Sequence, residues 1–419
     1  MEVNPTAAHA SGQAAGPEAD PAAGPAADPA ADPVGPEAAA HAAGTAGPEA
    51  AHAAGAGAGP EAGAVVPAVT GRDERLAPIS RVTRALQRPE LGALLGAAAI
   101  FVIFASTDST PQHLWLTQTG VAAWSAQAAF FGIMAVPVGL LMIGGEFDLS
   151  AGVMTGATAI VMALLVGRLH WNAWAAIAGT FAFAAVIGLL NGFVVVKSKL
   201  PSFIVTLATF FVLRGTSVGG VLLLNHGSTE VGLTGTSHPG LASAKTIFGN
   251  SLWASESVRS GYQIAVLWFI GVTAIAAWVL ARTTFGNWIF AVGGDANAAR
   301  NVGVPVTRTK ILLFLATSMS AGLVGIISFT QASSAVSEQG VGYEFFYIIA
   351  AVVGGCLLTG GYGSAIGAAL GACIIGMAFE GVIYSGWDSS WDFTFLGVVL
   401  FLAVVVNTVI YRRALKARR

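Results

Sequence analysis

Carboxylates placed in otherwise apolar sequence are the groups of this chain with the clearest potential for chemistry. Glu146 and Asp148 lie in the stretch Gly144-Gly-Glu-Phe-Asp-Leu-Ser-Ala-Gly152, where two apolar runs meet, and Glu380 lies within another apolar run. A charge in the core of a lipid bilayer costs about 2.5–3.5 kcal/mol or more, so such residues commonly serve a transport path. The alternative for 144–152 is a tight turn in which Asp148 or Ser150 caps the following helix. The alternative for Glu380 is an internal pairing.

A second glycine-rich stretch repeats part of the first. Gly360-Gly-Tyr-Gly-Ser364 again joins two apolar runs with a glycine pair and a serine. Glycine-interrupted, short hydrophobic segments in corresponding places of a membrane chain indicate a transport path. The candidates for that path are Gly144, Gly145, Glu146, Asp148, Ser150, Gly152, Arg214, Gly360, Gly361 and Glu380.

The segment 282–310 is the longest polar, basic stretch between two apolar runs on the side that we expect to be cytosolic. Asp295 suits a helix N-cap, 296–301 favour a helix, Gly303 suits the left-handed position after it, and Pro305 prevents continuation. So short a helix is marginal in water, so we expect it to lie against a surface. A soluble partner approaching the small Ala298 and Ala299 is one possibility, and an ordinary capped loop helix is the other. The candidate docking residues are Gly293, Gly294, Asp295, Ala296, Asn297, Ala298, Ala299, Arg300, Asn301, Gly303 and Val304.

The composition identifies the class of protein that carries these motifs. Of 419 residues, 55% are hydrophobic and 10% are charged, and the mean hydropathy is +0.71. Soluble domains carry about 25% charged residues, so this is an integral membrane protein. The net charge of −2 gives no electrostatic case for nucleic-acid binding. Cys356 and Cys373 lie in apolar runs as small packing residues, and no histidines have metal-ligand spacing, so we expect no metal site.

Ten hydrophobic spans predict an all-α, polytopic helical bundle. Their approximate bounds are 91–106, 121–143, 151–166, 173–196, 202–224, 262–281, 311–330, 343–358, 365–385 and 393–410. The third and eighth are short for a full crossing, which needs about 20 residues. With the N-terminus inside, Arg168, Lys245 and Arg259 are the basic residues of the external loops. This asymmetry places both termini in the cytosol and makes 225–261 the largest external loop.

Two segments precede the spans. Residues 1–70 repeat Gly-Pro-Glu-Ala and contain no Leu, Ile, Phe, Trp or Tyr, so they predict a disordered cytosolic tail. Residues 71–90 are a basic juxtamembrane segment that suits a helix on the lipids of the inner leaflet, or a basic flank that only sets topology. The remaining domain, 91–413, is the membrane domain.

The motifs, taken in order, resemble those of sugar-type ABC transporter permeases of the ribose and xylose group. Residues 144–152 are similar to the signature Gly-Gly-x-Asp-Leu-Ser-x-Gly of that family. Further matches are Leu200-Pro-Ser-Phe-Ile-Val-Thr-Leu-Ala-Thr209 with Arg214-Gly215, Phe285-Gly286 with Ala291-Val-Gly-Gly294 and Ala298-Ala299, Gly360-Gly-Tyr-Gly-Ser364 with Gly371-Ala372, and a closing span ending near Asn407. The resemblance covers about 91–413.

The resemblance implies a type II importer-like bundle that works as a dimer with a second permease copy. It implies a non-enzymatic transport subunit of a bacterial plasma membrane, with ATP and Mg bound by a separate ATP-binding subunit docked on 296–304, and no cofactor in this chain. An extracellular solute-binding protein would deliver a small sugar or polyol, or a nucleoside or furanosyl signalling compound. Asp295 stands where the family more often has Asn, and Phe379-Glu380-Gly381 replaces a more usual Asn-Asn-Gly, which leaves the solute open.

Two other classes of function fit the residues less well. The chain contains no Gly-Lys dipeptide and therefore no phosphate-binding loop of the Gly-x4-Gly-Lys-Ser/Thr type, so it is not expected to be the ATPase. An ion-coupled secondary carrier would use Arg214, Glu344 and Glu380 as a relay. A docking segment such as 282–310 would be superfluous in a carrier.

Overall fold

The computed structural model describes residues 89–225, 227–233, 238–252, 261–391, 393–402 and 405. The chain divides into two units, Met1–Glu74 and Arg75–Arg419, and every described residue belongs to the second. The predicted tail 1–70 and nearly all of the basic segment 71–90 lie outside the described residues, as does the end of the membrane domain from 406 to 413.

Eight helices of the described residues are long and apolar enough to cross a membrane. They are α2 (Pro89–Thr107), α3 (Gln118–Ile143), α4 (Ala151–Ala163, continued by the π-helical turn η2, Leu164–Arg168), α5 (Ala173–Ser198), α6 (Ser202–Leu224), α8 (Ala265–Arg282), α11 (Val306–Ala332) and α13 (Ala365–Tyr384). Two shorter apolar helices, α12 (Tyr343–Val353) and Phe393–Leu402, match the eighth and tenth predicted spans. The prediction of an all-α polytopic bundle is confirmed.

The eighth span is shorter than predicted because glycines end its helix. Residues 343–358 were expected to form one span, but α12 stops at Val353 and Gly354 caps it. Gly355 follows with a φ of +93°, a backbone conformation that glycine adopts without the steric penalty of a Cβ. The chain then turns through 354–364 into α13, whose N-cap Ser364 accepts a hydrogen bond from the Gly367 amide at 3.2 Å.

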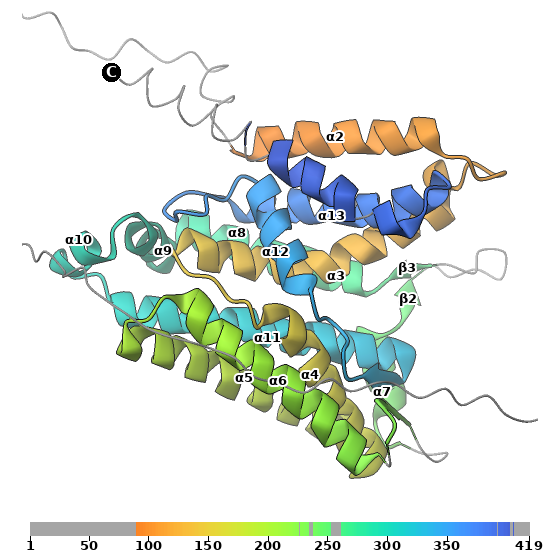
Figure 1. Ribbon diagram of the computed structural model, residues 1–419, viewed down its shortest axis with the longest axis horizontal. Helices are drawn as coiled ribbons and strands as arrows, with labels where there is room; N and C mark the ends of the chain where they lie inside the picture. The colour runs from red at the N-terminus through yellow and green to blue at the C-terminus, as the bar shows by residue number, and fades with distance from the viewer. Residues whose placement is uncertain are drawn as a thin grey trace, which may run out of the picture. The chain divides into compact units, whose positions relative to one another are not determined.

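Helix α3 forms the centre of the bundle, and most of its side chains are buried. It packs against α13, α8, α12 and α11, while α11 packs in turn against α5 and α4 (Figure 1). Small residues permit these approaches: a methyl group added at Gly376 of α13 would lie 2.6 Å from the Ala128 Cα of α3. Helices in lipid gain their association energy largely from such close packing.

The shorter elements lie at the ends of the long helices. Figure 1 shows α7 (Leu241–Phe248), β2 (Ser251–Leu252) and β3 (Tyr262–Gln263) at one end, and α9 (Thr284–Gly294) and α10 (Ala296–Asn301) at the other. We call these the α7 end and the α10 end. Strand β1 (Glu230–Gly232) pairs antiparallel with β4 (Ser334–Val336), and β2 pairs antiparallel with β3. The 3-10 turns η1 (Leu114–Leu116) and η3 (Ser389–Trp391) complete the elements.

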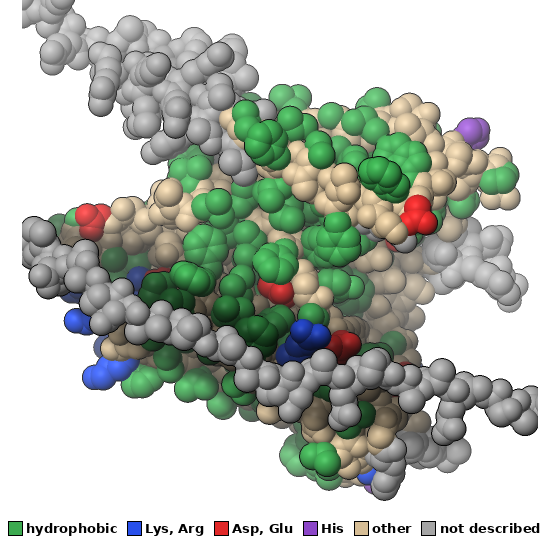
Figure 2. All heavy atoms as spheres, viewed as in Figure 1, with side chains coloured by type: hydrophobic (Ala, Val, Ile, Leu, Met, Phe, Trp, Pro, Cys, Tyr) green, Lys and Arg blue, Asp and Glu red, His purple; other side chains and the backbone are tan. Residues whose placement is uncertain are grey.

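The surface of the bundle agrees with a membrane environment. Large apolar side chains such as Phe203, Phe211 and Leu223 of α6 are exposed on the sides of the helices. The face in Figure 2 is dominated by hydrophobic side chains, and most of its Lys and Arg side chains gather toward the α10 end. Exposed apolar area of this extent is unusual for soluble monomers and suits contact with lipid.

Candidate transport site

The helix predicted in the segment 282–310 is present with the predicted caps. Helix α10 spans Ala296–Asn301, and Asp295 Oδ1 accepts hydrogen bonds from the amides of Asn297 at 2.8 Å and Ala298 at 3.0 Å. Gly303 has a φ of +88°, as its expected left-handed position requires, and Pro305 caps the start of α11. The segment contains a second helix, α9, which was not predicted from the sequence. The Thr283 side chain caps it by accepting a hydrogen bond from the Gly286 amide at 3.1 Å.

The surface that α10 needs is supplied in part by the chain itself. Ala299 is buried in a small apolar cluster with Val292 of α9 and Val306 of α11. Ala298 is exposed, and Val302 just after the helix is 79% exposed. The expectation that a partner approaches both alanines is therefore corrected for Ala299, which faces its own chain. The docking role of the outward face stays a prediction.

Four glycines meet at the α10 end. They are Gly145 between α3 and α4, Gly293 in α9, and Gly360 and Gly361 between α12 and α13, and we call them the glycine junction. The Gly361 amide donates to the Ile143 carbonyl at 2.8 Å. A methyl group added at Gly293 would overlap that same carbonyl and lie 2.7 Å from the Gly361 nitrogen. One added at Gly360 would lie 2.8 Å from the Gly293 oxygen and 2.9 Å from the Gly145 Cα. Backbone therefore touches backbone, and residues that the sequence analysis assigned separately to docking and to the path are brought together.

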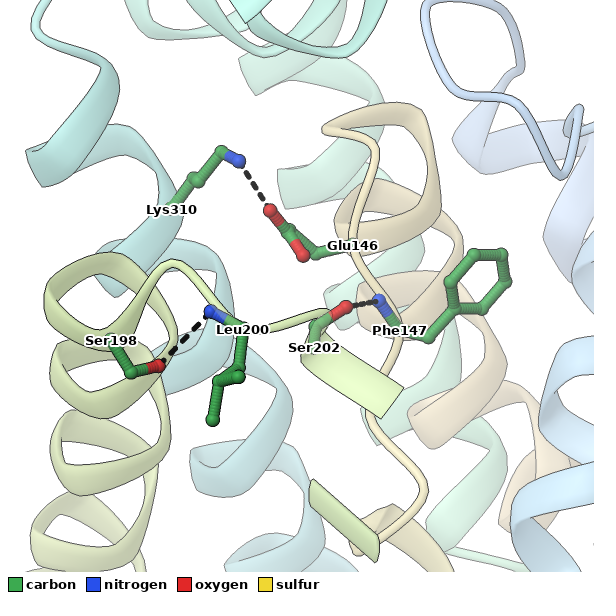
Figure 3. Close-up of polar contacts among 6 residues, drawn as sticks. All are labelled: Glu146, Phe147, Ser198, Leu200, Ser202 and Lys310. Atoms are coloured by element: carbon green, nitrogen blue, oxygen red, sulfur yellow. Dashed lines mark hydrogen bonds and ion pairs between the residues drawn. The ribbon is translucent and has the colours of Figure 1, made fainter. Parts of the chain in front are cut away.

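The 144–150 connection, between α3 and α4, is held by side chains of neighbouring helices (Figure 3). The Phe147 amide donates to Ser202 Oγ at 3.0 Å, and the Leu149 amide donates to Thr206 Oγ1 at 3.0 Å. Glu146 forms an ion pair with Lys310 at the start of α11. Buried backbone amides outside a helix need such partners, because an unpaired amide costs as much as a lost hydrogen bond.

Asp148 organises the last part of this connection. Its Oδ1 accepts from the Ser150 amide at 2.9 Å and from the Ser150 hydroxyl at 2.5 Å. Asn191 of α5 donates to Ser150 Oγ at 3.0 Å and accepts from Thr209 at 2.6 Å. The predicted cap is thus modified: Ser150 is the N-cap residue of α4 but makes no side-chain capping bond. Burial raises the pKa of Asp148 to about 6, against the lowering effect of the two bonds from Ser150.

A polar cavity of about 540 Å³ lies at the α7 end. Its walls come from α3, from β2, β3 and the residues just before each strand, from the end of α11 and from α13. The polar side chains that line it are Gln127, Asn250, Ser251, Gln263, Gln331 and Glu380. Its volume falls within the range of about 300–1,000 Å³ that ligand sites usually have. Glu380, predicted as a pathway residue, is therefore placed at a cavity suited to a polar ligand.

Hydrogen bonds order the walls of this cavity. Gln331 Nε2 donates to Gln263 Oε1 at 3.1 Å, and the Gln127 side chain hydrogen-bonds the Glu380 carboxylate. Gln127 and Gln331 were not predicted from the sequence, because the signal used within the spans was charge. Single carboxamides within apolar helices are the sequence signal that indicates both.

The remaining acidic and basic candidates have separate partners. Arg214 of α6 pairs with Glu338 at 2.9 Å, and their side chains are 44% and 59% exposed. Glu344 of α12 is buried and accepts a hydrogen bond from the Gly342 amide at 3.1 Å. Gly152 of α4 packs against this segment, where an added methyl group would lie 2.6 Å from the Glu344 nitrogen. Arg214, Glu344 and Glu380 thus each bind a different neighbour, which gives no support to the proton or sodium relay of a carrier.

Comparisons with known proteins identify related transport subunits. The family described as branched-chain amino acid transport system / permease component matches residues 120–404. The ribose import permease protein RbsC of Escherichia coli K12 is 33% identical over 325 residues, which cover 77% of this chain and 94% of that protein. The xylose transport system permease protein XylH of the same strain is 28% identical over 380 residues, covering 80% and 97%. The inner membrane ABC transporter permease protein YjfF is 29% identical over 284 residues, covering 67% and 80%.

Proposed function

The chain belongs to the family of branched-chain amino acid transport system permease components, and as an ABC transporter permease of that family it is, we propose, the membrane subunit of an importer for a small sugar or polyol. As a permease it is a transport subunit and not an enzyme. The polar cavity at the α7 end is the observation that carries the choice of solute. A sugar presents hydroxyl groups in several directions, and the cavity offers one carboxylate and four carboxamides to receive them.

The polar groups of the cavity suit a sugar or polyol in the strength of the hydrogen bonds that they form as well as in their number. Hydroxyls that donate to the Glu380 carboxylate form charge-assisted hydrogen bonds, which are roughly twice as strong as neutral ones. Gln127, Gln263 and Gln331 can each donate and accept, and Phe130 supplies an apolar wall. The relatives named for ribose and xylose import support a monosaccharide as the first candidate.

Energy for transport would enter at the opposite end. A separate subunit would bind ATP and Mg and would dock on the exposed residues of α10, around Asp295, Ala298 and Val302. The glycine junction would carry a displacement of α9 directly to the connections that precede α4 and α13. Such packed contacts are stiff, so a small shift at one element moves its neighbours.

The same proposal orients the chain. Lys197, Lys199, Arg282, Arg300, Arg308 and Lys310 cluster in the segments at the α10 end, which is then cytosolic by the positive-inside rule. Both termini would be cytosolic, in a bacterial plasma membrane. A solute-binding protein would deliver the solute at the α7 end, and a second permease copy, identical or different, would complete the membrane part.

A nucleoside or another furanosyl compound is the second candidate solute. Phe130 lines the cavity beside Gln127, so a flat base would find a ring to pack against and an amide to pair with.

Uptake by reconstituted vesicles tests the proposal. The permease, its ATP-binding subunit and the binding protein are reconstituted, and uptake of labelled pentoses, hexoses, polyols and nucleosides is measured with and without ATP. We expect ATP-dependent uptake of one sugar or polyol. Uptake confined to nucleosides would make a nucleoside, and not a sugar, the solute. Uptake driven by an ion gradient without ATP would contradict the proposal of an ATP-driven importer.

A further inference from the structure

A second cavity, lined mainly by aromatic and apolar side chains, lies just beyond the end of α13, and we call it the aromatic cavity. It measures about 430 Å³. Helix α13 carries Glu380 of the polar cavity one turn before it ends at Tyr384, so the aromatic cavity also belongs to the α7 end. The two cavities share no lining residue. The aromatic cavity is lined by Trp387, Asp388, Trp391, Thr394, Phe395 and Val398.

We propose that the aromatic cavity binds one membrane phospholipid whose headgroup ends in an amine, as in phosphatidylethanolamine. The ammonium group would lie against the Asp388 carboxylate and the two tryptophan rings, and the first part of an acyl chain would pack against Phe395 and Val398. The site does not depend on which solute the permease transports. Its leaflet, the outer one, rests on the orientation given in the proposed function.

The glycine after α13 sets the position of the first ring. Gly386 has a φ of +71°, and its amide donates to the Ile383 carbonyl at 3.0 Å. The Trp387 amide donates to the Val382 carbonyl at 3.1 Å. These two bonds and the left-handed glycine form a Schellman motif, which ends a helix with a sharp change of direction. The chain therefore leaves α13 abruptly, and the Trp387 side chain is 45% exposed beyond it.

Asp388 gives the aromatic cavity a negative charge. Its Oδ1 accepts a hydrogen bond from the Ser390 amide at 2.8 Å, and the bonds from the Ser390 side chain and amide lower the pKa of Asp388, so the carboxylate is ionised at neutral pH. No Lys or Arg occurs among the described residues that line the cavity. An ammonium group brings three donors and a positive charge to these oxygens. The lining therefore favours a headgroup that ends in an amine over one whose only charge is negative.

Tryptophans place the aromatic cavity at the level of the lipid headgroups. Trp387 and Trp391 are both exposed, and indole rings attract ammonium groups to their faces. Trp171 and Trp174, beside the start of α5, are exposed as well, and Trp174 Nε1 donates to Ser243 of α7 at 3.0 Å. Tryptophan gathers at the boundary between the hydrocarbon of a membrane and water. Four exposed tryptophans at the α7 end therefore mark that boundary.

The apolar part of the aromatic cavity continues from this boundary along the helix Phe393–Leu402. Phe395 and Val398 are three residues apart and share one face of that helix. The Phe395 ring lies 5.4 Å from the ring of the buried Phe104 of α2, so this wall is fixed to the bundle, whereas Val398 is exposed. The charge and the apolar wall thus stand in the same order as the headgroup and the acyl chain of a lipid. A soluble amine would use only the first of them.

Native mass spectrometry of the full-length permease in detergent tests the proposal. The purified chain is titrated with phosphatidylethanolamine or with phosphatidylglycerol of the same acyl chains, and Kd for the first bound lipid is measured. We expect phosphatidylethanolamine to bind about tenfold more tightly, Asp388→Asn to remove this preference and Asp388→Glu to keep it. Trp387→Leu should weaken phosphatidylethanolamine binding about threefold. Trp171→Leu is the matched control, because Trp171 is also 45% exposed at the α7 end but does not line the cavity, and it should leave Kd unchanged.

Three results would overturn the lipid site. They are equal binding of the two lipids by the parent protein, an unchanged preference in Asp388→Asn, and equal weakening by Trp387→Leu and Trp171→Leu. Phosphoethanolamine, which has the amine but no acyl chains, should not compete with the lipid at equal concentration, and competition would make the occupant a soluble amine. The measurement counts bound lipid and needs neither ATP nor solute. Its failure therefore leaves the proposed function standing, and uptake of a solute other than a sugar leaves the lipid site standing.

Discussion

The cavity at the α7 end is built from side chains, whereas the glycine junction at the α10 end is built from backbone. Around the cavity, long side chains such as Gln127, Gln263 and Glu380 stand on separate helices and leave about 540 Å³ between them. At the junction, side chains are absent and the backbones of Gly293 and Gly360 are in direct contact. The first arrangement can adapt to a ligand by changing rotamers, whereas the second can only move as a unit. Adaptable walls suit solute binding, and rigid contact suits the transmission of force.

A methyl group at the junction should have the largest effect. Gly293→Ala forces Cβ into the Ile143 carbonyl, so α9 must separate from the 144–150 connection, and overpacking of this kind typically costs about 1–3 kcal/mol. We expect ATP-dependent uptake to be lost and the melting temperature to fall. Gly294→Ala is the matched control, because an added methyl group there meets nothing within 4 Å. Equal behaviour of the two variants would contradict the tight junction.

A charge on the exposed face of α10 tests the docking prediction. Ala298→Glu keeps helix propensity, since Glu forms helices nearly as well as Ala, and changes only the outward surface. An unpaired charge desolvated at a protein interface costs about 2–5 kcal/mol, so the ATP-binding subunit should be lost on purification and uptake should fall at least tenfold. Permease abundance should stay level. If the ATP-binding subunit stays bound and uptake is normal, α10 is not the docking helix.

The same substitution at the neighbouring position provides a contrast. Ala299→Glu would place a carboxylate into the cluster with Val292 and Val306. That variant should lose thermal stability of the chain itself, because a buried unpaired charge is costly. A drop in stability for Ala298→Glu as large as that for Ala299→Glu would remove the distinction between the two faces of α10.

A change at the cavity should be smaller and specific for solute. Glu380→Gln keeps shape and removes the charge, so each solute hydroxyl that it accepts loses roughly half of its hydrogen-bond strength, about 1 kcal/mol. We expect KM for uptake to rise about fivefold and the preference among sugars to change, with abundance and docking unaffected. Glu338→Gln, in the half-exposed pair with Arg214, serves as the control for loss of an acidic charge. Unchanged KM and preference would assign Glu380 to structure.

Two buried aspartates extend the comparison to pH. Asp148, in the 144–150 connection, has a pKa raised by burial to about 6 from an ordinary 3.8. Between these values the folded state keeps a proton that the unfolded state releases, so stability falls as pH rises through that range. Asp108, between α2 and η1, also has burial acting to raise its pKa, but hydrogen bonds from Thr110 and Trp115 outweigh burial and lower the pKa. The stability that ionised Asp108 contributes to the folded state is present above pH about 4 and is lost as pH falls through the lowered pKa.

Melting temperatures of two amide variants measure this difference. Asp148→Asn should gain stability over the parent protein as pH rises from 4.5 to 7, by roughly 3 kcal/mol at most for the full pKa shift. Asp108→Asn should be less stable than the parent protein by a nearly constant amount over this range, and the difference should shrink as pH falls below about 4. A constant difference from the parent across pH for Asp148→Asn would mean that this carboxylate does not titrate in the native protein.

The sequence by itself determined the features that depend on neighbours along the chain. Hydropathy over about 20 residues located each of the ten apolar helices, because burying backbone in lipid requires a continuous apolar helix. The caps of α10 were equally local: Asp295 binds amides two and three residues away, and Gly303 takes the conformation that only glycine adopts easily. The motifs that resemble the permease family also lie within short stretches, and the family was identified from them.

Tertiary structure alone decided which of these local features meet. Gly145, Gly293 and Gly360 are far apart in sequence, and their contact follows from how α3, α9, α12 and α13 pack. The same holds for the cavity, because Gln127 is one polar residue on an apolar helix until Gln263, Gln331 and Glu380 are folded around it. The burial of Ala299 beside an exposed Ala298 was likewise outside the reach of sequence, since six helical residues contain too little pattern to show which face is covered. Packing between distant segments fixes these sites, and neither composition nor local periodicity encodes it residue by residue.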